Sequence, residues 1–355
     1  MKLISQIARL LTRNSTLVIL VVVLLLVAVG VDLFGGALIE RITIVLFINL
    51  ALVLGLQVYM GNSGVLSFAQ IGFMGIAAYG SILFSMTPQM KSIALPNLYP
   101  VLTDVQLPFF LALIVGTILA TLVAAVVGFP LMRLTSGAAI ATFALLVIIH
   151  RVLINWDRVT NGARTIFGIE RYTTLWVSAA FGILFVVLAY WFRETSLGLK
   201  LRASREDEHA AASIGINIVI VRWVAFILCA FMTGVAGVLW AHFITSFSPV
   251  SFYLKQTFLI ITMLIIGGTG SVSGAVVGAL VVTFIFEGMR GIENAINISG
   301  SVPFTVSGLT EVFLSTALIV ILILRPAGIT GGREFKWPKK RFQPEVSSNS
   351  VENST

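Results

Sequence analysis

Charged residues are scarce in this chain of 355 residues. They make up 11% of it, whereas 58% of it is hydrophobic and the mean hydropathy is +1.02. A soluble domain carries about 25% charged residues, and no soluble fold of this size can bury so much apolar surface. The composition therefore excludes an ordinary soluble protein and predicts one whose surface is covered largely by the lipid bilayer.

Cysteine, metal ligands and phosphate-binding loops are also nearly absent. Cys229 is the single cysteine, so an intrachain disulfide is excluded. The histidines, His150, His209 and His242, are far apart, and no cluster of metal ligands accompanies them. No Gly-x-x-x-x-Gly-Lys-Ser/Thr occurs, so the chain cannot hold ATP through a P-loop. We expect no catalytic residue, metal or cofactor in this chain.

Long charge-free segments occupy most of the sequence. The longest runs from Ile42 to Met90 and has room for two spans of roughly 20 residues. The segments lack the alternation of an outer-membrane barrel, so we predict an all-α polytopic membrane protein with about ten transmembrane helices, some short or broken. The expected spans are 16–34, 38–60, 64–86, 107–128, 136–152, 173–192, 223–248, 255–269, 271–287 and 307–325.

The distribution of basic residues predicts the orientation. With the N-terminus inside, 15 of the 23 Lys and Arg residues lie in inner segments, as the positive-inside rule requires. Both termini are therefore predicted to be cytoplasmic. The net charge of +8 reflects this orientation, and we expect no nucleic-acid partner. After a transmembrane domain (1–328), the segment 329–355 mixes Pro, Ser, Asn and Glu and is expected to be a disordered cytoplasmic tail.

Two polar, glycine-rich breaks separate apolar runs. The first carries Gly61 and Gly64, and the second carries Gly267, Gly268 and Gly270. Glycine permits tight chain reversals and close helix contacts. Transporters with internal repeats often have broken helices in corresponding places, but two unrelated tight turns would give the same pattern.

Polar residues inside the expected spans are candidates for a translocation path. Each can instead satisfy the backbone of a neighbouring helix, which is the commoner role. No ionisable residue lies in the middle of an expected span, which disfavours a proton-coupled carrier. The candidates are Asn49, Gln57, Gln70, Thr142, His242 and Thr262.

The longest charged segment, 193–222, lies on the predicted cytoplasmic side. Ser204 and Asp207 have the spacing of a capping box, which predicts a helix that begins at Ser204. Three alanines at 210–212 favour helix, and Gly215 would end it. This small-faced helix could dock on another protein or serve as a solvated connector.

The run Glu208-x-Ala210-Ala211-x-x-x-Gly215 resembles the coupling-loop motif of ABC importer permeases. With 61–68, 202–217, 267–274 and 325–328, it makes the chain similar to one family, the LivM-type permease subunits of bacterial branched-chain amino acid ABC transporters. One segment departs from the family pattern. Thr160–Gly168 replaces a Thr-Gly-Gly-x-x-Gly-like outer segment. The extra Arg164 within it and Arg158 just before it leave the choice of binding protein open.

The resemblance implies a multi-pass permease in the bacterial inner membrane. Its partners would be a second related permease, two cytoplasmic ATPase subunits that carry ATP and Mg²⁺, and a periplasmic substrate-binding protein. Branched-chain amino acids are the implied substrates, with urea, short amides or other amino acids as alternatives. The implied ATPase-coupling residues are Glu206, Glu208, Ala210, Ala211 and Gly215. The implied hinge residues are Gly61, Gly64, Gly267, Gly268 and Gly270.

Two other classes of protein fit the sequence less well than an ABC permease subunit. A stand-alone secondary transporter or channel leaves the coupling motif unexplained and lacks a mid-membrane charge. An intramembrane enzyme needs a catalytic pair within the bilayer. The aspartates all lie outside the expected span centres, at Asp32, Asp104, Asp157 and Asp207.

Overall fold

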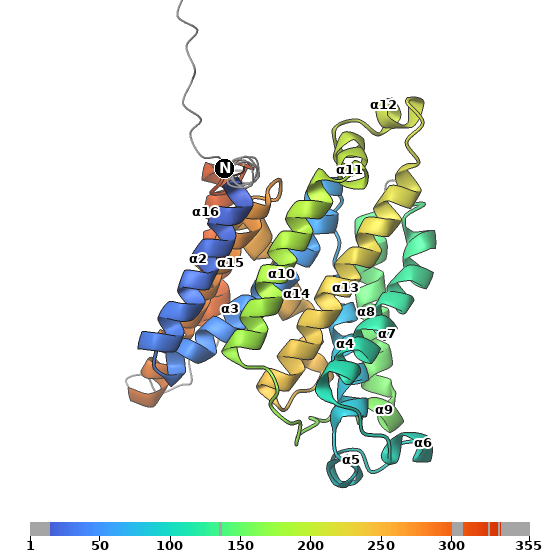
Figure 1. The fold of residues 1–355 in the computed structure, drawn as a ribbon, viewed down its shortest axis with the longest axis vertical. Coiled ribbons are helices and arrows are strands. Elements are labelled where there is room, and N and C mark those ends of the chain that lie inside the picture. Colours follow the sequence, from blue (N-terminus) through green and yellow to red (C-terminus); the bar gives the residue numbers. More distant parts are fainter. Residues whose placement is uncertain (1–14, 135–136, 300–307, 326, 333, 335–355) are drawn as a thin grey trace, which may run out of the picture.

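The computed structural model describes residues 15–134, 137–299, 308–325, 327–332 and 334. These ranges contain helices and no strand, apart from one isolated bridge between Ile166 and Phe247 (Figure 1). The predicted all-α polytopic fold is confirmed. The long helices are α2 (Ser15–Phe34), α3 (Ala37–Leu56), α4 (Gln70–Ser85), α7 (Phe109–Leu131), α8 (Ala138–Asn155), α10 (Leu175–Glu194), α13 (Ile218–Ile244), α14 (Leu254–Gly267), α15 (Val272–Ser299) and α16 (Leu309–Leu324).

Shorter helices connect the long ones. A π-helix, η1 (Gln57–Gly61), follows α3 directly, and a 3-10 helix, η2 (Pro249–Phe252), precedes α14. Figure 1 shows α11 and α12 at one end of the bundle and α5, α6 and α9 at the other. Their bounds are α5 (Pro88–Ala94), α6 (Pro100–Thr103), α9 (Asp157–Thr160), α11 (Ser196–Glu206) and α12 (Glu208–Ser213).

Each expected span overlaps one long helix. Eight of the described helices are long and apolar enough to cross a membrane, and α4 and α16 are shorter apolar helices. The charge-free stretches predict these helices because a segment in lipid must satisfy its backbone groups without water, and a helix does so within itself. The number that cross completely and the cytoplasmic location of both termini stay predictions.

Two expected boundaries were wrong. The third span was expected to begin at residue 64, but α4 begins at Gln70, after a non-helical stretch that includes Gly64 at a φ of 72°. The ninth span was expected to be short, but α15 has 28 residues and continues through Glu287 and Arg290. A helix of that length is about 42 Å long, which exceeds the roughly 30 Å of the hydrocarbon layer. The charged part can therefore lie at the membrane surface.

Helix α3 lies at the centre of the bundle. Of the apolar window in Ala37–Gly61, 89% is buried inside the protein, against 17% for α2, which lies on the outside. Helices α10, α13 and α15 pack around α3, and α13 also packs on α4 and α7. Thr43 and Asn49 of α3 are buried and therefore face protein rather than lipid.

Helices α14 and α15 approach each other backbone to backbone. A Cβ atom added at Gly278 would lie 1.9 Å from the Met263 carbonyl oxygen, and one added at Gly267 would lie 1.9 Å from the Gly274 carbonyl oxygen. Small residues permit such approaches between membrane helices. This hairpin carries the second glycine break at its turn.

Gly278→Ala is expected to destabilise the protein by about 1–3 kcal/mol, the usual cost of overpacking. The added methyl group must displace the backbone of α14. Gly288→Ala is the matched control, since Gly288 lies in the same helix with open space around its Cβ position. The midpoint of thermal unfolding in detergent, monitored by tryptophan fluorescence, is measured for both variants. Equal midpoints for the two variants would contradict the close packing.

Candidate functional site

The charged segment 193–222 folds into two short helices instead of one. The predicted start at Ser204 is wrong, because Ser204 lies in the last turn of α11 and its hydroxyl donates to the Leu201 carbonyl at 2.8 Å. The chain breaks at Asp207, with a φ of −154° and a ψ of 113°. The Asp207 carboxylate accepts a hydrogen bond from the Ala210 amide at 2.9 Å and thereby caps α12. This bond lowers the pKa of Asp207.

The five coupling residues that the resemblance implies lie in and beside α12, and they do not form one exposed surface. Glu206, Ala210 and Gly215 are exposed, but Ala211 is 2% exposed and packs inward. Glu208 forms an ion pair with the buried Arg222. Ala211 therefore supports the position of α12 and is not available to a partner.

An exposed apolar residue completes the outer face of this segment. Ile214 is 76% exposed and precedes Gly215, which has a φ of 84°. Sequence reasoning missed Ile214 because apolar residues are expected inside. Its signal was an isolated isoleucine between a capped helix and a glycine suited to a left-handed turn.

The two glycine breaks touch each other. A Cβ atom at Gly61 would lie 2.4 Å from the Thr269 carbonyl oxygen, so the end of η1 is packed against the turn between α14 and α15. In the second break, Gly268 has a φ of 117°, which only glycine adopts readily. The breaks, distant in sequence, form one polar junction.

Arg205 connects α11 to both breaks. Its Nη1 donates to the Gly61 carbonyl at 2.6 Å. A Cβ atom at Gly64 would lie 2.9 Å from Arg205 Cγ, and one at Gly270 would lie 3.9 Å from Nη1. Gly61 is the last residue of η1, where a cation is favoured by the helix dipole. A single side chain thus links the charged segment to the whole junction.

A C-terminal strap, residues 327–332 and 334, also contacts the second break. The Ile329 amide donates to the Ile266 carbonyl at 2.9 Å, and the Thr330 hydroxyl donates to the Gly267 carbonyl at 2.8 Å. The strap includes residues that were expected to begin a disordered tail from 329. The rest of that tail, residues 333 and 335–355, lies outside the described residues.

Glu334 of the strap caps α15. Its carboxylate accepts hydrogen bonds from the Val272 amide at 2.8 Å and the Ser273 amide at 3.0 Å. It also pairs with Arg193, at the end of α10. A carboxylate at a helix N-terminus satisfies unpaired amides and is favoured by the dipole.

Four of the polar candidates lie inside the protein. Gln57 is fully buried, and neither of its amide atoms has a hydrogen-bond partner among the described residues. Gln70 is also buried, with Nε2 lacking such a partner. Thr142 accepts from the Phe68 amide at 3.3 Å, and His242 contacts Ser85 Oγ at 3.3 Å and a backbone carbonyl.

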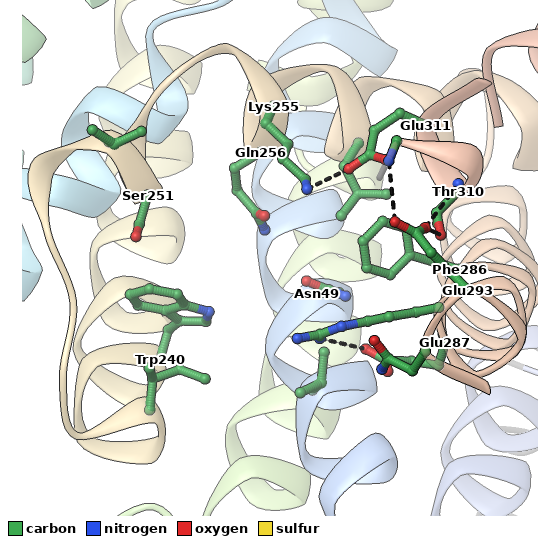
Figure 2. Close-up of a pocket in the computed structure, with 17 residues that line it drawn as sticks. Asn49, Trp240, Ser251, Lys255, Gln256, Phe286, Glu287, Glu293, Thr310 and Glu311 are labelled. Atoms are coloured by element: carbon green, nitrogen blue, oxygen red, sulfur yellow. Dashed lines mark hydrogen bonds and ion pairs between the residues drawn. The ribbon is translucent and has the colours of Figure 1, made fainter. Parts of the chain in front are cut away.

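Asn49 and Thr262 line two adjacent pockets. The larger, of about 550 Å³, lies between α3, α13, η2, α14, α15 and α16, and Figure 2 shows Asn49 between its charged groups. The smaller, of about 310 Å³, includes Thr262 and shares Lys255 and Glu311 with the first. Both side chains are buried, Asn49 at 5% and Thr262 at 7% exposed, and each lies at the wall of its pocket.

The larger pocket holds charges of both signs. Lys255 pairs with Glu311, and Arg290 Nη1 lies 3.9 Å from Glu287 Oε1. Glu293 accepts from the Gly308 amide at 3.1 Å and the Thr310 hydroxyl at 2.7 Å. Sequence reasoning missed this cluster because its charges come from three separate helices, α14, α15 and α16. In the described part of the chain, no three acidic, His or Cys residues form a metal site.

The comparisons identify relatives that transport small molecules. A family model described as branched-chain amino acid transport system / permease component matches residues 38–324. The permease protein LivM of the high-affinity branched-chain amino acid transport system of Escherichia coli K12 is 26% identical over 317 residues, which cover 79% of this chain and 67% of that protein.

Two further relatives match smaller parts of the chain. LivH, a permease protein of the same E. coli system, is 29% identical over 160 residues, covering 45% of this chain and 47% of that protein. The nucleoside ABC transporter permease protein NupC of Lactococcus lactis subsp. cremoris is 24% identical over 226 residues, which cover 59% of this chain and 69% of that protein.

Asp207→Ala is expected to speed amide hydrogen exchange in α12 by roughly two- to thirtyfold, the range for one lost N-cap. Asp207→Asn is the matched control, because an asparagine oxygen can still accept the Ala210 amide.

The same cap predicts a pH dependence. The folded pKa of Asp207 lies below its usual value of about 3.9. The cap's contribution is therefore present above that value and is lost as the pH falls through the folded pKa. Protection of α12 should fall below about pH 4 in the natural chain, relative to Asp207→Asn at the same pH. Parallel curves for the two proteins would refute the assignment.

Proposed function

The chain belongs to the permease component family of branched-chain amino acid transport systems, and we propose that it forms half of the membrane channel of an ABC importer for branched-chain amino acids. It is a multi-pass membrane protein and a permease subunit, not itself an enzyme. The observation that carries the proposal is the family match over 38–324, which includes the α11–α12 segment and both glycine breaks.

The exposed face of α12 is the proposed docking site for a cytoplasmic ATPase subunit. Ala210, Ile214 and Gly215 present a small, partly apolar surface at one end of the bundle. Small side chains allow a helix to enter a groove of a partner, and one projecting apolar residue can anchor it there. Glu206 lies beside this surface and would fix the register by charge.

Arg205 is the proposed route from this docking site to the translocation path. A displacement of α12 moves α11, and Arg205 then pulls on the Gly61 carbonyl. Because Gly61 touches the α14–α15 turn, both breaks move together. A rigid unit that shifts between two packed arrangements is the usual form of such switches.

The proposed assembly contains four kinds of chain. A second, related permease would complete the path, as the match to both LivM and LivH supports. Two ATPase subunits would bind ATP and Mg²⁺ at the α11–α12 end, inside the cell. A periplasmic binding protein would contact the opposite end, near Arg158 and Arg164. This arrangement requires the bacterial inner membrane.

The substrate proposed first is a branched-chain amino acid. The match to LivM covers more of this chain, at higher identity, than the match to the nucleoside permease. Urea, short amides and other amino acids remain alternatives within the same class of transporter. A carrier that works alone is disfavoured, because it would not need the exposed α12 face.

Reconstitution tests the proposed function. The chain is co-expressed with its candidate ATPase, permease and binding-protein partners, purified in detergent and placed in proteoliposomes. We expect the ATPases to co-purify and leucine uptake to require ATP and the binding protein. Failure of any ATPase to co-purify, or uptake that continues without ATP, would overturn the proposal.

Arg205→Ala is expected to lower leucine uptake per ATP hydrolysed by roughly tenfold or more, the effect of one lost charge-assisted hydrogen bond. Assembly should be unaffected, because α12 keeps its cap and its ion pair. Arg205→Lys should retain part of the uptake, since an ammonium can still donate to the Gly61 carbonyl. Lys200→Ala, exposed on the same helix, is the control. Unchanged coupling in Arg205→Ala would exclude this route.

A further inference from the structure

The larger pocket lies far from the docking site. Glu287 is fifteen residues beyond Val272 along α15, or about 22 Å from the glycine junction at 1.5 Å per residue. Arg290 and Glu293 follow within the next two turns. The pocket therefore lies at the end of the bundle opposite α11 and α12, where a substrate would enter.

The charges of the pocket disfavour an anion. Lys255 and Arg290 contribute two positive charges, and Glu287, Glu293 and Glu311 contribute three negative ones, so the net charge of the lining is −1. The lipid headgroups or phosphates that bind at basic sites require the opposite balance. A ligand that carries both signs, or a cation, is compatible with this lining.

Two of the carboxylates already have close partners. Glu311 pairs with Lys255, and Glu293 accepts hydrogen bonds from the start of α16. Glu287 and Arg290 differ, because their 3.9 Å separation is longer than a hydrogen bond. Glu287 is 18% exposed and Arg290 is 63% exposed, so the acid lies deeper and the base lies at the mouth.

The remaining walls mix polar side chains, such as Gln256 and Asn294, with apolar ones. Val45, Trp240, Ile244, Leu259 and Phe286 line the same space. Figure 2 shows Trp240 and Ser251 on one side of it and Glu287 on the other, with the Asn49 amide between them. The volume of about 550 Å³ lies within the roughly 300–1,000 Å³ of small-molecule sites, and the polar groups can orient a ligand against the apolar ones.

We propose that this pocket binds an α-amino acid as a zwitterion with an aliphatic side chain, as the first site on the path through the permease. Arg290 contacts the carboxylate, Glu287 and the Asn49 carbonyl oxygen receive the ammonium group, and the side chain packs on Leu259 and Phe286. The fork of Arg suits a carboxylate. The proposal rests on the proposed function and adds the location and the recognition chemistry.

A thiol-protection experiment tests the site directly. The natural chain has one cysteine, Cys229, which is buried, so Cys229→Ala gives a background without thiols. Ser251→Cys then places one reactive group at the pocket, and Val250→Cys, at a 63% exposed lining position, is a second reporter. Labelling by a water-soluble methanethiosulfonate is followed in the purified complex in nanodiscs, without the binding protein.

Leucine is expected to slow this labelling at least threefold at saturation. The anion 4-methylpentanoate lacks the ammonium group and 3-methylbutylamine lacks the carboxylate, so neither should protect at the same concentration. Equal protection by the anion would indicate an anion site, and equal protection by the amine a cation site. Either result, or no protection by leucine, would overturn the proposal.

Charge removal provides the second readout. Glu287→Gln and Arg290→Gln should each raise the leucine concentration for half-protection by about tenfold, because each removes one charge-assisted contact. Arg151→Gln, an exposed arginine on α8 outside the pocket, is the control. Co-purification of the ATPases checks that each variant folds. Natural affinity in both pocket variants would refute the assignment of these residues.

The outcomes separate this inference from the proposed function. If ATP-dependent leucine uptake is normal but leucine protects neither reporter, the pocket assignment fails and the transporter assignment stands. If uptake does not depend on ATP, the proposed function fails, whatever the protection results are.

Discussion

The need to satisfy backbone groups where a membrane helix is interrupted governs this structure. A continuous helix pairs its own amides and carbonyls, but a break leaves them without partners in a medium that offers little water. Here Arg205 supplies a donor for the Gly61 carbonyl, Thr330 supplies one for the Gly267 carbonyl, and Glu334 accepts the first amides of α15. The breaks can exist only because polar segments from elsewhere in the chain are folded over them.

This requirement joins parts of the molecule that would otherwise be independent. The helices α11 and α12 could have been a simple connector, yet one arginine makes them part of the junction. The strap likewise joins the junction to another helix, because Glu334 caps α15 and also pairs with Arg193 at the end of α10. The proposed docking site on α12 is therefore connected to both breaks by polar contacts.

Much of the fold follows from local properties of the sequence. The absence of charge over long stretches predicts each long helix, because the cost of placing charge in lipid acts residue by residue.

Features that depend on distant partners were not predictable. The start of α12 depends on the extended backbone at Asp207, the burial of Ala211 depends on how α12 packs, and the strap looks polar and irregular until its partners are known. The charged pocket was missed for the same reason, since Lys255, Glu287 and Glu311 come from three helices. The two breaks were predicted because glycine itself marks them in the sequence. Their contact with each other was not predicted, because it depends on how distant helices pack.

The strap also has a consequence for the order in which the protein is built. Ile329, Thr330 and Glu334 follow every described helix in the chain, so the ribosome delivers them after α14 and α15 have already been made. Until then, the Gly267 carbonyl and the first amides of α15 lack the partners that they have in the finished fold. The turn between these helices is thus the last part of the bundle to mature. A newly made chain that stalls before Ile329 would carry this junction open, with polar backbone exposed to whatever quality-control machinery surveys the membrane.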